Sequence, residues 1–143
     1  MRFTLGVPQE LNHADQAVAA SPLNITGMWW SWQGGYKFLK IDGRVPGGQD
    51  TEPRLFHLGS TQCEPDGDSY SCGNINRPSF EVAATADQTI TFDVATLFDG
   101  AHLDADDGGP AGCMSGADDP DCAPLFGNLG ISGSSPKAIF SVR

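Results

Sequence analysis

The four cysteines of this chain form two pairs with the same spacing, and this arrangement constrains the fold more than any other feature. Cys63 and Cys72 flank one turn-rich acidic segment, and Cys113 and Cys122 flank another. An even number of cysteines with equal loop lengths favours two disulfides, and of the three possible connectivities the local one is preferred. The alternative is a four-thiolate metal site, which usually has a much closer spacing of its paired ligands. Two disulfides indicate an oxidising compartment.

Composition narrows the class of protein. The 143 residues suit one domain, residues 1–143, with enough chain for a proper core. A net charge of −10 disfavours nucleic acid and anionic membranes as partners. No apolar run is long enough to span a membrane. The first eight residues lack the apolar stretch of a signal peptide and resemble a strand already under way. We therefore expect either a removed signal or a start inside a longer protein.

Short alternating segments dominate the chain and predict strands. Eighteen glycines and ten prolines are consistent with many turns between them. Two segments, 80–84 and 90–94, alternate in the same way and are expected to form a hairpin or to neighbour each other in one sheet. Residues 125–131 are expected to be irregular. The prediction is an all-β fold, an antiparallel β-sandwich with long disulfide-bracketed loops. The expected strands are Phe3–Val7, Met28–Trp32, Tyr36–Ile41, Leu55–Leu58 and Ala138–Val142.

The segment Gly27–Phe38 holds all three tryptophans and one of the two tyrosines. If it is extended, Trp30 and Trp32 share one face, and Tyr36 continues that row. So much aromatic surface either forms the inner layer of a core or lines a binding site. The sequence leaves both possibilities open.

Three histidines are the remaining candidates for chemistry. His13 and His57 each have a structural explanation, in a loop beside Asp15 and on an apolar strand, whereas His102 is expected to be exposed among aspartates. Imidazole suits copper, zinc and iron, and with the thiols in disulfides the pattern favours copper over zinc. The acidic run 104–109 superficially resembles a calcium loop but lacks its glutamate and glycine spacing. No catalytic motif is present, so no enzyme activity is expected.

Several segments together resemble a known family, over residues 3 to 140. They are Gly6–Pro8, Leu11–Asp15, Ser21–Asn24, Met28–Phe38, Phe56–Cys63 and Gly112–Gly116. The chain is similar in these segments to the MbnP-like proteins, which carry the metallo-mystery-pair four-Cys motif and are related to the methanotroph copper proteins MopE and CorA.

The resemblance implies a periplasmic or secreted copper-binding protein. In such relatives the copper site uses histidines and a tryptophan oxidised to kynurenine by a dihaem partner of the cytochrome c peroxidase type, the MbnH-type protein. Carried onto this chain, His13 and His57 are the predicted copper ligands, and Trp30 and Trp32 are candidates for oxidation or hole transfer. The predicted supporting residues are Gln33, Tyr36 and Lys37.

One departure and two alternatives accompany this interpretation. Family members carry further strands before the Gly6–Pro8 segment, and this chain lacks them. We therefore expect the chain to be truncated, and the missing strands are a second candidate location for a copper ligand or for the oxidised tryptophan. The first alternative is an extracellular carbohydrate-binding module that uses the Trp/Tyr cluster. The second is an interaction domain in which Trp30 and Trp32 belong to the core.

Overall fold

The structure is a computed structural model that describes residues 1–46, 54–85 and 87–143. Strands predominate, as predicted, and all named strand pairs are antiparallel. The helices are short, and none within the described ranges is long and apolar enough to cross a membrane. The elements are β1 Arg2–Thr4, α1 Gln9–Asn12, a 3-10 turn at Thr26–Met28, β2 Trp29–Ser31, β3 Gly35–Gly43, β4 Arg54–Gly59, β5 Thr61–Asp66, β6 Ser69–Asn74, β7 Ser79–Glu81, β8 Ile90–Phe92, α2 Val94–Leu97, α3 Cys122–Leu129 and β9 Phe140–Val142.

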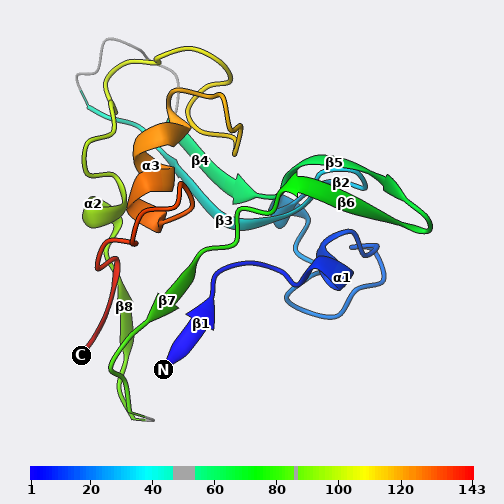
Figure 1. Ribbon diagram of the computed structural model, residues 1–143, viewed down its shortest axis with the longest axis horizontal. Coiled ribbons are helices and arrows are strands. Elements are labelled where there is room, and N and C mark those ends of the chain that lie inside the picture. Colours follow the sequence, from blue (N-terminus) through cyan, green and yellow to red (C-terminus); the bar gives the residue numbers. More distant parts are fainter. Residues whose placement is uncertain (47–53, 86) are drawn as a thin grey trace.

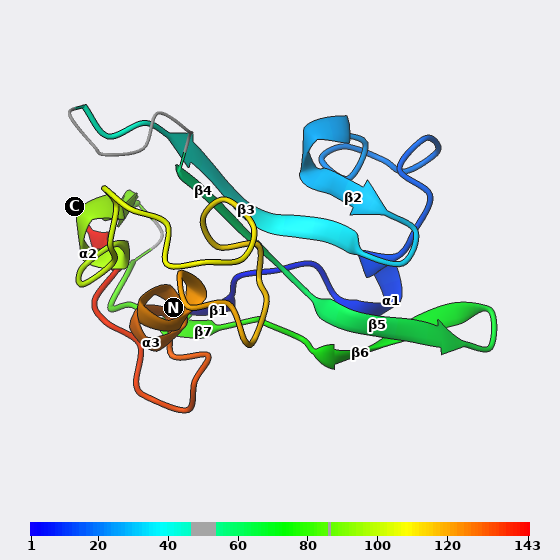
Figure 2. The same cartoon turned by 90° about the horizontal axis from the view of Figure 1, so that it is seen from above.

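The strands form one three-stranded sheet and three two-stranded ones among the described residues. β2, β3 and β4 form the larger sheet, and the pairs are β5 with β6, β1 with β7, and β8 with β9. Figure 1 shows β3 and β4 as the long central strands, and Figure 2 shows the β5–β6 hairpin projecting away from α3. The all-β, antiparallel, sandwich-like prediction is confirmed. The expected pairing of segments 80–84 and 90–94 is wrong, because each strand pairs instead with a chain terminus.

The hydrophobic core lies between one face of β4 and the helix α3. Phe56 and Leu58 are fully buried on β4, and Leu125 and Leu129 of α3 belong to the same cluster. The expectation of irregular structure at 125–131 is wrong over most of that range. The helix buries one face against the sheet and ends at Gly130, whose φ of 76° gives the left-handed conformation that commonly terminates helices.

Both predicted disulfides are present. Cys63 on β5 lies directly opposite Cys72 on β6, and the two are bonded. Cys113 is bonded to Cys122 at the start of α3, and both residues are buried in the core. The second disulfide therefore ties the segment before it to the helix that covers the sheet.

The segment 112–115 runs beside β4 and is held to it by backbone hydrogen bonds. Phe56 and Cys113 form a parallel bridge, in which Cys113 N–H donates to Leu55 O and His57 N–H donates to Cys113 O, both at 2.9 Å. Gly112 begins this segment with a φ of +69°, and a Cβ there would lie 2.3 Å from Leu55 O. Only glycine allows the chain to approach β4 this closely.

The acidic segments lie together beyond this bridge. His102, which is 69% exposed, pairs with Asp107 at 2.8 Å, as expected for a solvated histidine. The carboxylate oxygens Oδ2 of Asp119 and Asp121 are buried without a hydrogen-bond partner in the described part of the chain. Burial raises the pKa of Asp121, and the neighbouring carboxylates of Asp106, Asp119 and Asp107 raise it further.

Replacing Gly112 by alanine should lower the free energy of unfolding by about 2–4 kcal/mol, because the new Cβ meets β4 and the left-handed backbone is strained. Chemical denaturation monitored by circular dichroism measures this loss. Gly43→Ala is the control, since a Cβ there meets no atom of the described residues within 4 Å. Equal losses in the two variants would contradict the close approach at Gly112.

Asp121→Asn should stabilise the protein at neutral pH by about 0.5–1 kcal/mol. Folding raises the pKa of the Asp121 carboxyl group, so its ionised form at neutral pH destabilises the folded state, and asparagine removes this charge. As pH falls through the raised pKa toward the unfolded value near ~4, the wild type recovers this stability and the gain disappears. Thermal denaturation between neutral and acid pH measures the difference. The exposed Asp118→Asn removes the same charge and should show a smaller gain. A destabilising Asp121→Asn at neutral pH would overturn this account.

Candidate functional site

The tryptophan segment is divided between two faces of the sheet. Trp29 lies opposite Tyr36 in the β2–β3 register and packs against the core, where Tyr36 is 1% exposed. Trp30 points to the other face. The pairing shifts after Trp29 and β2 ends at Ser31, so Trp32 lies in the following turn and packs edge-on against Trp29 at 5.5 Å. The predicted row of Trp30, Trp32 and Tyr36 on one face is therefore wrong, because the strand stops too early.

The indole of Trp30 rests directly on the backbone of β4. A Cβ on Gly59 would lie 2.4 Å from Cζ3 of the Trp30 ring, so only glycine leaves room for the indole there. The ammonium of Lys37 lies 5.8 Å from the ring centroid, within the range of a cation–π contact. Trp30 is thus held between its own strand and β4, on the face of the sheet opposite the core.

An open groove of about 460 Å³ lies beside this indole. Its wall includes Trp30, the disulfide residue Cys63 and the thioether side chain of Met114. The other lining residues are Ser31, Gln33, Gly34, Ser60, Thr61, Gln62 and Glu64. The groove combines an aromatic ring, a soft sulfur donor, several neutral polar groups and the carboxylate of Glu64.

His57 lies on the same face of β4 as Gly59, two residues earlier in the strand. Its Nε2 lies 2.7 Å from Asp42 Oδ1, and the other oxygen of this carboxylate pairs with Lys40 at 2.8 Å. The hydrogen bond from Lys40, followed by that from His57, lowers the pKa of Asp42. An ionised Asp42 accepts the Nε2 proton, so the lone pair of His57 is on Nδ1. No hydrogen bond to Nδ1 is found among the described residues.

Met114 is the neighbour of His57 on this face. The bridge between Phe56 and Cys113 directs both of those side chains into the core, so the next residues on each strand, His57 and Met114, face the opposite side. Ser115 then fixes the segment, since its hydroxyl donates to His57 O and accepts from Gly59 N–H, each at 2.8 Å. Sequence reasoning did not select Met114. The only available signal was its place after Cys113 in the family-like Gly112–Gly116 segment.

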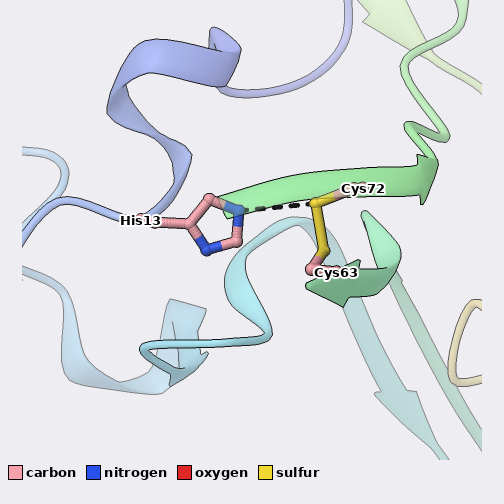
Figure 3. A group of neighbouring side chains, drawn as sticks. All are labelled: His13, Cys63 and Cys72. Atoms are coloured by element: carbon pink, nitrogen blue, oxygen red, sulfur yellow. Dashed lines mark hydrogen bonds between the residues drawn. A yellow bond between two sulfur atoms is a disulfide. The ribbon is translucent and has the colours of Figure 1, made fainter. Parts of the chain in front are cut away.

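His13 lies at the end of α1 and has a different set of neighbours. Its Nδ1 lies 2.7 Å from Trp32 O, and its Nε2 lies 3.2 Å from the Asn12 amide and 3.4 Å from Cys72 Sγ. The ring packs against Tyr70 with centroids 4.9 Å apart. Figure 3 shows His13 directed at the Cys63–Cys72 disulfide.

The described contacts do not support one ion shared by His13 and His57. Asn12, next to His13, accepts a hydrogen bond from Tyr36 N–H, whereas His57 pairs with Lys40. Four residues of extended strand separate these two points, a distance of roughly 13 Å. The predicted pair of copper ligands is thus divided between two surroundings, and the tertiary structure supplies Met114 and Cys72 as the soft neighbours of each.

Of the three predicted supporting residues, Gln33 lines the groove and Lys37 contacts the Trp30 ring. Gln33 donates to Cys63 O at 2.8 Å, and Lys37 donates to Gly27 O at 3.0 Å beside the Trp30 ring. Burial lowers the pKa of Lys37, and the charge of Lys40 lowers it further. Tyr36 does not belong to this group, because its ring is in the core, where burial raises its pKa.

Comparison with known proteins gives a consistent result. The MbnP family model matches residues 1–115. The structure is similar to that of MbnP from Methylosinus trichosporium, with a TM-score of 0.76 and 31% sequence identity over 92% of this chain. The match spans 55% of that protein, so the chain corresponds to about half its length. No curated protein matches the chain. On the extent of the family match, the chain belongs to the MbnP family.

Proposed function

We propose that this chain binds copper on the face of β4 that Trp30 covers, at the edge of the groove, with His57 and Met114 as its ligands and a modified Trp30 as the third component. The observation that supports the proposal is the bridge between Phe56 and Cys113, because the residues that follow them, His57 and Met114, are then expected on the face that Trp30 covers. Two disulfides support an oxidising location outside the cytoplasm.

The donor set fits copper. A thioether is a soft ligand that suits copper in its lower oxidation state, and imidazole suits copper generally. Asp42 orients the imidazole by accepting its Nε2 proton, as the outer partners of metal-binding histidines do. The Trp30 ring and the aliphatic part of Lys37 exclude water from one side. When bound, the copper would be cargo or a redox-active ion, and these residues would hold and shield it.

Trp30 is the better candidate for oxidation to kynurenine, because it lines the groove, whereas Trp32 packs on Trp29 outside it. The conversion removes one indole carbon as formate and adds oxygen, and it gives an aniline nitrogen that indole lacks. The oxidising equivalents would come from peroxide through a dihaem partner of the peroxidase type. Trp32, which is 50% exposed and in edge contact with Trp29, is suited to pass electrons between the surface and this region.

The carbohydrate-binding alternative has less support in this geometry. A sugar platform needs aromatic faces presented together to solvent, but Trp30 is pressed on Gly59 and Trp32 is directed elsewhere. Trp32 alone is half exposed. Loss of binding to an immobilised polysaccharide on replacing Trp32, with copper binding absent, would favour that alternative.

His57→Ala and Met114→Leu should each weaken copper(I) binding at least about tenfold, because each removes one proposed ligand. Competition against a chromophoric copper(I) chelator, with the disulfides intact, measures the affinity. Asp42→Asn should weaken binding less, since the imidazole keeps its nitrogen but loses its orienting carboxylate.

The matched control is His13→Ala, which removes a buried imidazole outside the groove and should leave this affinity unchanged while the disulfides are intact. A tenfold loss in His13→Ala with no change in His57→Ala would show that the ligand assignment is wrong.

Co-expression with a dihaem peroxidase-type partner from the same genome should oxidise Trp30. Mass spectrometry of peptides should then show one tryptophan with a carbon replaced by oxygen, and Trp30→Phe should abolish this product and lower copper binding. Trp32→Phe should leave the product at position 30. Modification confined to position 32 or 29 would contradict the assignment of Trp30.

A further inference from the structure

A second group of metal-binding atoms includes Cys63, which also lines the groove beside Trp30, but none of the ligands proposed for that groove. His13, Cys63 and Cys72 each contribute one donor atom, and all three atoms lie within 4.8 Å of one another. They come from three parts of the chain, namely the end of α1, β5 and β6 (Figure 3). The two sulfurs are joined by the disulfide bond, so they can bind one ion together with His13 only after that bond is broken and the side chains rotate apart.

The imidazole of His13 is oriented toward the sulfurs. Its Nδ1–H donates to Trp32 O at 2.7 Å, so the lone pair is on Nε2, which lies 3.4 Å from Cys72 Sγ. The amide of Asn12 donates to the same Nε2 at 3.2 Å, consistent with a neutral ring that accepts there. A hydrogen bond from Nδ1 to a backbone carbonyl is a common way to hold a metal-binding histidine. Tyr70 stacks on the ring and limits its rotation.

The two disulfides differ in ways that matter here. Cys113 and Cys122 are each 1% exposed within the core, whereas on the projecting β5–β6 hairpin Cys63 is buried but its partner Cys72 is only half-buried and offers its sulfur to an external thiol. An accessible disulfide is the one that exchanges with an external thiol. The hairpin does not depend on the bond alone, because its strands continue to pair on both sides of Cys63 and Cys72. Reduction can therefore release two thiols while the hairpin remains formed.

We propose that the Cys63–Cys72 disulfide is a reversible gate on a second copper(I) site formed with His13. A dithiol reductant of the thioredoxin class supplies two electrons and two protons, the sulfur–sulfur bond breaks, and the reductant becomes a disulfide. Copper(I) then displaces the thiol protons to solvent and keeps its oxidation state. Two thiolates and one imidazole form a soft three-donor set, and no other carboxylate, cysteine or histidine joins the group in the described ranges.

This site shares no ligand with the proposed His57–Met114 site and does not depend on it, although Cys63 also lines the groove. Oxidation of the pair removes both thiolates at once, because disulfide sulfur is a poor ligand compared with thiolate. The site would therefore take up copper under reducing conditions and release it when the bond forms again.

The test is copper(I) titration of the full chain, with chelator competition, before and after mild reduction by a soluble dithiol. Reduction should add one copper equivalent and thiolate-to-copper absorption in the ultraviolet. His13→Ala should weaken this additional binding at least about tenfold, and Cys63→Ser/Cys72→Ser should abolish it. His57→Ala and Met114→Leu should retain it, which separates this proposal from the one for the groove. Circular dichroism of each variant checks the fold.

Alkylation gives a second readout that needs no variant. In the reduced wild type, copper(I) should protect Cys63 and Cys72 from a thiol-alkylating reagent, as measured by mass spectrometry of the peptides. The proposal is overturned if reduction adds no copper, if the additional copper persists in Cys63→Ser/Cys72→Ser, or if alkylation of this pair is unaffected by copper. If a folded His13→Ala variant binds the additional copper(I) with unchanged affinity, His13 is not a ligand and the proposed site is wrong.

Discussion

The alignment of residues 112–115 along β4 is the constraint on which the candidate site depends. Backbone hydrogen bonds on either side of Cys113 hold this segment, the Ser115 hydroxyl continues the contact, and the Cys113–Cys122 disulfide joins it to α3. Cys113 of this segment belongs to the core, and the next residue, Met114, lines the groove. Core packing and the position of the Met114 thioether therefore depend on the same short segment.

Glycine supports this arrangement at two points where a side chain would not fit. Gly112 allows the segment to approach β4, and Gly59 leaves the space that the Trp30 ring occupies. Each glycine exchanges side-chain packing for a close approach of backbone to another group. The Trp30 ring and the segment that carries Met114 can therefore both approach β4, because the residue at each point of contact is a glycine.

The family and the local elements were accessible from the sequence, but the ligand partners were not. Equal cysteine spacing predicted both disulfides, and alternation predicted most strands. The helix α3 was missed because its apolar residues follow a cysteine and a proline in a short, glycine-containing stretch. The face shared by Trp30 and Trp32 was predicted wrongly, since alternation holds only while a strand continues and β2 ends at Ser31. Met114 gave no local signal of its own, because one methionine in a loop has no periodicity.

The sequence by itself determined the cysteine pairs, the strand-rich class, the acidic surface and the MbnP resemblance, because these depend on spacing and composition within short windows. Only the tertiary structure decided that His57 neighbours Met114 and that His13 neighbours Cys72. Both juxtapositions join residues more than fifty positions apart through strand register and loop path. Such close contacts between distant parts of the sequence arise from long-range packing, which no local pattern encodes.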